Sequence, residues 1–276
     1  MDNMETLKKK PTHELVLGMT GSGKTVFSRG ALIPSYQDRM SMIIVDTKHD
    51  PNDKLWQLAD YSTSSPKVLI KLIEKGYHVY YIIDYNSEEE RWSKFNEVCH
   101  IVANMKGQVV TYVNEAGDVM DCVHMPFWFD DMLRKGRGLK HWAIVESQRP
   151  SLIVHPNLFN NVGSFWLFRC GTKDRSAIKK WFDREDLETL GEMEEYSFMW
   201  SDGFQYKHFP KLNMEALRYD RTRSDETEPE RTTYLDTIGI GDCVRLTEDL
   251  LHDAEGSPRD GGDGKGGDRE IQVRLG

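Results

Sequence analysis

Short apolar runs alternate with longer amphipathic stretches over the first 210 residues of the chain. The apolar runs are mostly continuous, which is typical of strands buried on both faces of a parallel sheet. They predict strands at Glu14–Leu17, Met42–Val45, His78–Ile83, Val109–Val113, His141–Val145 and Ser164–Phe168. Apolar positions at helical spacing predict helices at Thr25–Ile33, Glu88–Met105, Phe127–Arg134 and Arg175–Phe182. Strands that alternate with helices imply right-handed crossovers, so we expect an α/β fold whose parallel sheet carries helices on both faces.

The pattern changes at the end of this region. Tyr196–Trp200 and Phe204–Phe209 are two β-rich runs, and Ser201-Asp202-Gly203 between them contains an Asp-Gly turn signal. Two such runs around such a turn predict a terminal β-hairpin.

Charge and composition divide the chain near residue 212. The chain has 276 residues with 36 Lys+Arg and 45 Asp+Glu, a net charge of −9. Residues 221–276 hold 8 of the basic and 14 of the acidic residues, or −6, which leaves 28 and 31, or −3, for residues 1–220. Glycines crowd 256–268, as in disordered linkers, whereas Tyr234–Leu251 has a weak helical pattern. We expect a basic N-terminal arm at 1–12, a core domain at 13–212 and a disordered, acidic, Gly-rich tail at 213–276.

Composition argues against several classes of protein. No apolar run reaches the roughly 18 residues of a membrane-spanning helix, and the N-terminus lacks the apolar stretch of a signal peptide. The four cysteines stand far apart, so we expect a reduced, cytoplasmic protein without a zinc site or disulfide framework. The acidic total excludes a broadly basic DNA-coating protein, but a nearly balanced core can still carry local basic contacts.

Gly18-Met-Thr-Gly-Ser-Gly-Lys-Thr25 matches the phosphate-loop pattern G-x-x-x-x-G-K-[ST] without a gap. It follows a predicted strand and opens a predicted helix, as the motif requires. Backbone N–H groups of such a loop surround the phosphates, the lysine reaches the β- and γ-phosphates, and the last hydroxyl binds Mg²⁺. We therefore expect ATP and Mg²⁺ as cofactors, with Thr25 as a metal ligand and Lys24 in catalysis. The residues expected to bind the nucleotide are Gly18, Thr20, Gly21, Ser22, Gly23, Lys24, Thr25 and Val26.

A second strand supplies candidates for the chemistry of hydrolysis. Val109–Val113 ends in Asn114-Glu115, where phosphoryl transfer on this fold needs a carboxylate near the metal. We predict that Glu115 orients or deprotonates the attacking water. Asn114 stands where an aspartate usually binds the water shell of Mg²⁺. We therefore expect Asn114 to contact Mg²⁺ through a water molecule, without contributing a negative charge. Two alternatives stay open: both residues only start a turn, or Asp118 or Asp121 supplies the carboxylate.

Three further strand ends carry recognisable motifs. Residues 43–50 form a run ending in D-x-K-x-D, residues 141–151 a run ending in Gln-Arg-Pro-Ser, and residues 165–175 a run followed by a basic turn. With the phosphate loop first and the hairpin last, this order resembles the FtsK/HerA superfamily of DNA-pumping ATPases over about residues 13 to 209. The resemblance implies an ASCE/RecA-like P-loop NTPase fold.

The resemblance also implies roles for particular residues. Gln148 matches the family's polar sensor of the γ-phosphate. Members work as ring oligomers, usually hexamers, in which an arginine finger reaches the neighbour's nucleotide and neutralises developing charge. Arg175 matches that arginine and Arg169 is the second choice, although either could be an ordinary ion-pair partner. Asp46 and Lys48 match the family's strand-end D-x-K, and we expect them to organise the site or the subunit boundary.

Family members thread double-stranded DNA through the ring and touch its phosphates with pore loops. The densest basic stretch of the core runs from residue 134 to 140, and we place it in a loop before the strand that ends in Gln148. It offers cations for sequence-independent phosphate contacts, namely Arg134, Lys135, Arg137 and Lys140. The alternative is a solvated helix end whose cations complement the helix dipole.

The expected function is ATP-driven translocation of double-stranded DNA. The chain leaves no room for the extra modules of cellular members, so it resembles the minimal genome-packaging ATPases of viruses, located in the host cytoplasm or on the virion. We expect a ring of five or six copies that docks on a capsid vertex or portal protein, with the acidic tail as the candidate docking segment. Two alternatives remain: a phage assembly ATPase resembling the zonula occludens toxin family, or a nucleotide-dependent switch that hydrolyses weakly because of Asn114.

Overall fold

A nine-stranded sheet runs through the core of the computed structural model, which describes residues 11–37, 39–48, 53–182, 185–209 and 211. The strand order is β3-β4-β2-β5-β6-β1-β7-β8-β9. All neighbours pair in parallel from β3 to β7, and β8 and β9 are antiparallel. The strands are β1 (Glu14–Leu17), β2 (Ser41–Asp46), β3 (Tyr61–Thr63), β4 (Val79–Ile82), β5 (Val109–Val113), β6 (His141–Ser147), β7 (Ser164–Leu167), β8 (Phe198–Ser201) and β9 (Tyr206–Phe209). The predicted α/β fold with a parallel sheet and a terminal hairpin is confirmed.

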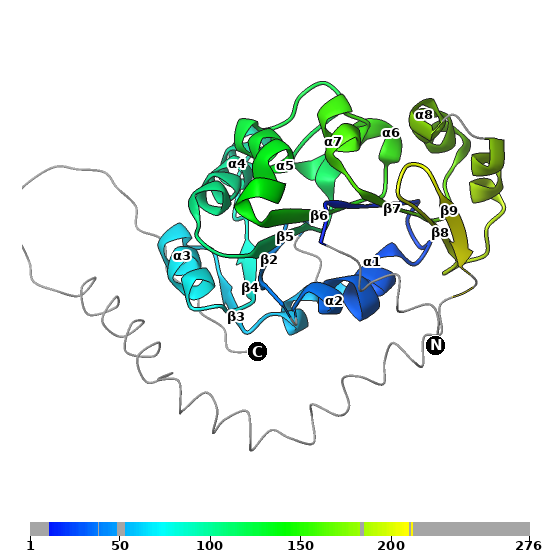
Figure 1. Ribbon diagram of the computed structural model, residues 1–276. Helices are drawn as coiled ribbons and strands as arrows, with labels where there is room; N and C mark the ends of the chain where they lie inside the picture. Colours follow the sequence, from blue (N-terminus) through cyan, green and yellow to red (C-terminus); the bar gives the residue numbers. More distant parts are fainter. Residues whose placement is uncertain (1–10, 38, 49–52, 183–184, 210, 212–276) are drawn as a thin grey trace, which may run out of the picture. The chain divides into compact units, whose positions relative to one another are not determined.

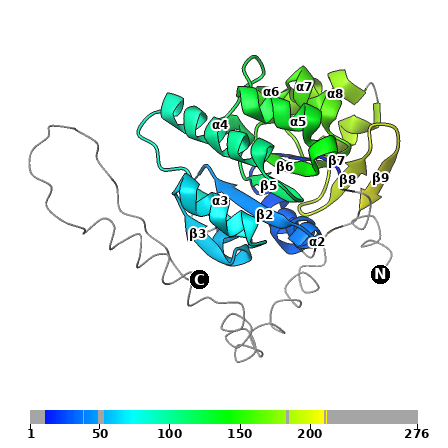
Figure 2. The same cartoon turned by 60° about the vertical axis from the view of Figure 1, so that its left-hand side comes forward.

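Helices cover both faces of this sheet (Figures 1 and 2). One continuous helical segment follows the phosphate loop on one face and comprises α1 (Lys24–Phe27), a π-helical turn (Ser28–Leu32) and α2 (Ile33–Gln37). The other α-helices are α3 (Pro66–Glu74), α4 (Glu88–Asn104), α5 (Phe127–Leu139), α6 (Pro150–Ile153), α7 (Pro156–Asn161) and α8 (Thr172–Phe182). Short 3₁₀ turns lie at Leu55–Leu58, Ala116–Asp118 and Glu185–Gly191.

Alternate residues of each buried strand enter two separate apolar cores. On β1, Leu15 and Leu17 belong to the core cluster that includes residues of α3, α4 and α5. On the opposite face, the ring of Phe27 from α1 lies 4.8 Å from the Trp166 ring of β7 and 4.8 Å from the Phe198 ring of β8. Burial on both faces explains why these strands read as continuous apolar runs.

The parallel register brings the carboxyl ends of the central strands to one edge. Leu17 at the end of β1 pairs with Ser147 of β6 on one side and with Leu167 of β7 on the other. Val113 of β5 in turn pairs with Val145 of β6. The segments that follow β1, β5, β6 and β7 therefore start close together, which is where ligands bind in open α/β sheets.

Several local predictions were wrong or lie outside the described residues. Helix α5 continues to Leu139, so the basic stretch 134–140 ends a helix and does not form the predicted loop. The hairpin pairs Ser201 with Tyr206, so its loop is longer than the predicted Asp-Gly turn. Strand β3 and helix α3 were not predicted. The basic arm before residue 11, the helix at Tyr234–Leu251 and the acidic tail fall outside the described residues.

His13, next to the start of β1, makes stability depend on pH. Burial, helped by the charge of Arg137, lowers the pKa of His13 from 6.5 to about 4. Its Nδ1 accepts a hydrogen bond from the backbone N–H of Ala143 at 3.0 Å, so the ring is held neutral. The unfolded chain takes up a proton near pH 6.5 but the folded chain does not, so stability is lost as pH falls from about 6.5 toward 4.

We predict that this group lowers the free energy of unfolding by about 2 kcal/mol between pH 7 and pH 5. His13→Asn keeps an acceptor for Ala143 but cannot titrate in this range, so the variant should lose that part of the pH dependence. Chemical denaturation at both pH values measures it, with exposed His208→Asn as the control. Equal pH dependence in His13→Asn and wild type would contradict the prediction.

Candidate functional site

The loop after β1 is anchored to the strands on both of its sides. The backbone N–H of Gly18 donates to the carbonyl of Ser147 at 3.3 Å, and that of Met19 donates to the carbonyl of Arg169 at 2.8 Å. Gly23 adopts φ 104°, and a Cβ there would meet the Tyr196 ring at 2.6 Å. Glycine at this position therefore satisfies both a left-handed backbone and a close contact with the segment before β8.

Lys24 projects into the curve of this loop. Its Nζ donates to the carbonyl of Met19 at 3.0 Å, and only 3% of the residue is exposed. Burial lowers the pKa of Lys24, while the negative charges of Glu146 and Glu115 oppose that shift. A buried ammonium with carboxylates nearby is suited to a polyanionic ligand that completes its solvation.

Thr25 contacts a carboxylate that sequence reasoning missed. Its Oγ1 donates to Oε1 of Glu146 at 2.7 Å, and Glu146 is fully buried on β6. Oε2 of Glu146 accepts from Ser28 at 2.9 Å and from the Tyr112 hydroxyl at 2.8 Å. Glu146 directly follows the predicted strand His141–Val145. A glutamate at the end of such a buried strand was the sequence signal that could have revealed this contact.

Glu115 and Gln148 lie together at the ends of β5 and β6. Oε2 of Glu115 accepts from the backbone N–H of Gln148 at 3.0 Å, and Oε1 accepts from the Ser147 hydroxyl at 2.8 Å. Lys48 after β2 approaches the same carboxylate, with Nζ 3.8 Å from Oε2. The side-chain oxygen of Gln148 accepts from Thr20 of the phosphate loop at 2.8 Å. The structure thus brings Thr20, Glu115 and Gln148 into one cluster.

The environment of Glu115 favours the role of a base. Burial raises the pKa of Glu115, although hydrogen bonds from Ser147 and Gln148 and the charge of Lys48 counteract this effect. A carboxylate with a raised pKa accepts a proton more readily than an exposed one.

Asn114 is part of a different network from Thr25. Its Oδ1 accepts from the backbone N–H of Thr47 at 3.0 Å and from the Thr47 hydroxyl at 2.8 Å. Its amide donates to Oδ1 of Asp46 at 3.0 Å, and Oδ2 of Asp46 accepts from the Tyr80 hydroxyl at 2.6 Å. These bonds fasten the end of β5 to the end of β2. The Mg²⁺ role of Asn114 stays a prediction.

The two arginine candidates lie in different settings. Arg169 follows β7, and its carbonyl is the acceptor for Met19 of the phosphate loop. Arg175 of α8 donates through Nη1 to the carbonyl of Glu188 at 3.1 Å and through Nη2 to Thr172 at 3.3 Å. Within the described residues the Arg175 guanidinium therefore bonds to its own chain, and the finger role stays a prediction for both arginines.

The basic stretch lies at the opposite edge of the sheet, where β6 begins. Arg134 pairs with Asp130 at 2.9 Å and Lys135 with Asp131 at 2.7 Å. Arg137 and Lys140 are exposed, and Lys140 adopts the left-handed conformation that ends α5. The location at a helix end fits the alternative of a dipole-complementing C-terminus; DNA contact stays a prediction.

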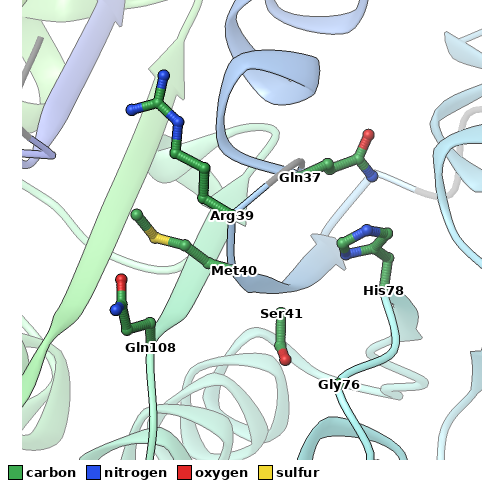
Figure 3. A pocket seen from close by; sticks show the side chains of 7 residues that line it. All are labelled: Gln37, Arg39, Met40, Ser41, Gly76, His78 and Gln108. Carbon is green, nitrogen blue, oxygen red and sulfur yellow. The ribbon is translucent and has the colours of Figure 1, made fainter. Parts of the chain in front are cut away.

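A cavity of about 440 Å³ that is largely open to solvent also lies at this amino edge, before β2, β4 and β5 (Figure 3). Its lining residues are Gln37, Arg39, Met40, Ser41, Gly76, His78 and Gln108. None of them belongs to the phosphate loop or the carboxyl edge, so we do not assign the nucleotide to this cavity.

The residues at the carboxyl edge fit ATP and Mg²⁺. The first residues of the helical segment, Lys24 and Thr25, offer backbone N–H groups, and Lys24 also offers a buried ammonium. Thr25 offers a hydroxyl backed by a carboxylate, an oxygen donor set that suits Mg²⁺. None of the helices in the described part of the chain combines the length and apolar character that crossing a bilayer requires.

Known structures with similar architecture were found by comparison, whereas no family model and no curated protein matches the sequence. The genome packaging NTPase B204 of Sulfolobus turreted icosahedral virus 2, in complex with AMPPCP, matches with TM-score 0.57 and 18% identity over 73% of this chain and 98% of that one. VirB4 of Thermoanaerobacter pseudethanolicus matches with TM-score 0.57 and 11% identity over 75% and 92%. The pCW3 conjugation coupling protein TcpA, with ATPγS, matches with TM-score 0.50 and 14% identity over 78% and 66%.

At such low sequence identities, the similarity to these structures shows a shared fold and nothing more. The chain has the fold of these structures, and the P-loop NTPase fold that the resemblance of its motifs implied is confirmed. Among these similar structures, the B204 complexes with AMPPCP and ATP-γ-S show that B204 binds nucleotide.

The Asn114 network predicts that Asn114→Asp destabilises the fold. The new carboxylate would stand 3.0 Å from Asp46, where both residues are buried, so one of the two must take up a proton or move. We expect the free energy of unfolding to fall by about 2 to 4 kcal/mol. Chemical denaturation at pH 7 measures this effect.

The double variant Asp46→Asn/Asn114→Asp is the matched control. It restores one amide and one carboxylate, so it should regain part of the stability. A single Asn114→Asp variant as stable as wild type would show that the two side chains do not oppose each other in the folded protein.

Proposed function

We propose that the chain is an ATPase that translocates double-stranded DNA, and that it packages a viral genome. The observation that carries this proposal is the cluster of Thr20, Glu115 and Gln148, with the buried Lys24 close to Glu115, at the carboxyl edge of the sheet in a chain with the fold of B204. B204 is a genome packaging NTPase, and the match covers 98% of its length; both observations support the packaging assignment.

The site residues divide the work of hydrolysis. Backbone N–H groups at the start of α1 and the ammonium of Lys24 hold the β- and γ-phosphates. Glu115 accepts a proton from the attacking water, and Gln148, which already contacts Thr20, orients that water or a γ-phosphate oxygen. Thr25 would hold Mg²⁺, which when bound would supply positive charge to stabilise the charge developing on the phosphates.

Glu115→Gln should separate binding from hydrolysis. The amide keeps most of the hydrogen-bonding shape but cannot take a proton, so we expect phosphate release to fall at least ~100-fold while ATP affinity changes little. Lys24→Ala should instead weaken ATP binding itself. Calorimetry and single-turnover hydrolysis measure the two effects. If Glu115→Gln hydrolysed ATP at the wild-type rate, a residue other than Glu115 would be the general base.

Exposed cations at the amino edge are the proposed DNA contacts. All four cations are exposed, but Arg134 and Lys135 are paired with acidic residues of their own helix. We therefore assign most of the phosphate contact to Arg137 and Lys140. Such contacts weaken steeply with salt and do not depend on sequence.

Duplex DNA should stimulate ATP hydrolysis by the wild-type chain. Arg137→Ala/Lys140→Ala should remove most of the stimulation without changing the basal rate, because these residues lie at the edge opposite the phosphate loop. Lys67→Ala/Lys71→Ala, two exposed lysines of α3, makes the same charge change as a control. Phosphate release with and without duplex DNA at low salt is the measurement.

A nucleotide-dependent switch is the second candidate. It is favoured by the restraint of Glu115 by Lys48, Ser147 and two backbone N–H groups, and by the engagement of Asn114 with Thr47 and Asp46. Tight ATP binding with slow phosphate release that duplex DNA does not increase would support this candidate over the translocase.

A further inference from the structure

Glu146 occupies a junction between three elements of the core. Its carboxylate accepts hydrogen bonds from Thr25 of α1, Ser28 of the π-helical turn and Tyr112 of β5. Glu146 itself lies on β6 and is fully buried. A carboxylate at such depth needs donors on both oxygens, and these three hydroxyls supply them.

The hydrogen bond to Thr25 fixes the direction of the Thr25 hydroxyl. In this pair the Thr25 hydroxyl is the donor and Oε1 of Glu146 is the acceptor. With its hydrogen directed at Oε1 of Glu146, 2.7 Å away, the Thr25 oxygen keeps its lone pairs for another partner. Mg²⁺ binds hydroxyl oxygens through such lone pairs.

Asn114 cannot fill the same role with the contacts that it makes here. Both ends of its amide are engaged, by Thr47 on the oxygen and by Asp46 on the nitrogen. These bonds lead toward β2, away from the Thr25 pair. Asn114 is also neutral, so it would not offset the charge of a metal ion.

We propose that Glu146 is the positioning residue that prepares Thr25 to bind Mg²⁺, in place of an acidic residue at the end of β5. The inference rests on the proposed function, because it concerns a Mg²⁺–nucleotide complex in the phosphate loop. Glu146 acts through Thr25 and does not itself touch the nucleotide.

The test is the contribution of Mg²⁺ to ATP binding, measured as the ratio of the dissociation constant in EDTA to that in Mg²⁺. Calorimetry on the full chain gives both constants without requiring hydrolysis. Glu146→Gln should reduce the ratio at least ~10-fold, as is usual when an outer partner of a metal ligand is changed. Its dissociation constant in EDTA should change by no more than about twofold, because the phosphate-binding N–H groups are untouched.

Matched variants separate positioning from a structural role. Ser28→Ala and Tyr112→Phe remove the other two donors to Glu146 but leave the Thr25 bond, so they should lower stability and keep the ratio. Thr25→Val should lose the Mg²⁺ contribution, and Thr25→Ser should keep it. In the double variant Thr25→Val/Glu146→Gln the losses should not add, because the charge of Glu146 acts on Mg²⁺ through the Thr25 oxygen, which Thr25→Val removes.

Each outcome decides the matter. A full Mg²⁺ contribution in folded Glu146→Gln overturns this inference and leaves the proposed function standing, as does an additive double variant. If wild type binds no ATP in either condition, the proposed function itself fails. If thermal melting shows that Glu146→Gln does not fold, Glu146→Asp replaces it. This variant keeps the charge but shortens the reach to Thr25, so the ratio of dissociation constants should fall. An unchanged ratio overturns the inference.

Discussion

The parallel pairing of β1 between β6 and β7 is the constraint on which the site depends. Leu17 stands opposite Ser147 and Leu167, so the chain that leaves β1 meets the ends of both neighbours at once. Backbone hydrogen bonds from Gly18 and Met19 to these neighbours continue the sheet into the phosphate loop. A loop held on both sides keeps its N–H groups aimed at one place, as binding a phosphate requires.

Buried polar groups then divide the edge of the sheet into two networks. One joins Thr25, Ser28 and Tyr112 through Glu146, and the other joins Asp46 and Thr47 through Asn114. Each buried carboxylate has its donors, as burial requires. Glu115 lies beside both networks with Lys48 and Ser147, which places a proton acceptor at the strand ends without leaving it unpaired.

Sequence patterns predicted the central strands and the phosphate loop because both are local signals. Continuous apolar runs gave β1 and β5 with their observed bounds, and the glycine spacing gave the loop. The edge strand β3, only Tyr61–Thr63, has too few residues to show a pattern. The basic stretch 134–140 contains two glycines, which favour a loop, yet Gly136 packs tightly under His13 and His141 in the last turns of α5. Tertiary packing overrode local preference there.

The sequence predicted which residues lie in the site, but it did not predict their hydrogen-bond partners. Lys24, Glu115 and Gln148 were found at the carboxyl edge, because parallel strands end together. The contact of Thr25 with Glu146 joins residues 121 positions apart and depends on which strand neighbours β1. No single segment of the sequence specifies the order of strands in the sheet. This contact and the bonds of Asn114 to Thr47 and Asp46 were therefore seen only in the structure.

A structure of the chain with Mg²⁺ and AMPPCP tests the central claim most directly. We expect the phosphates against the N–H groups at the start of α1, the Thr25 hydroxyl on the metal, and the γ-phosphate facing Glu115 and Gln148. Nucleotide bound at the amino edge instead, in the cavity lined by Arg39 and His78, would contradict it.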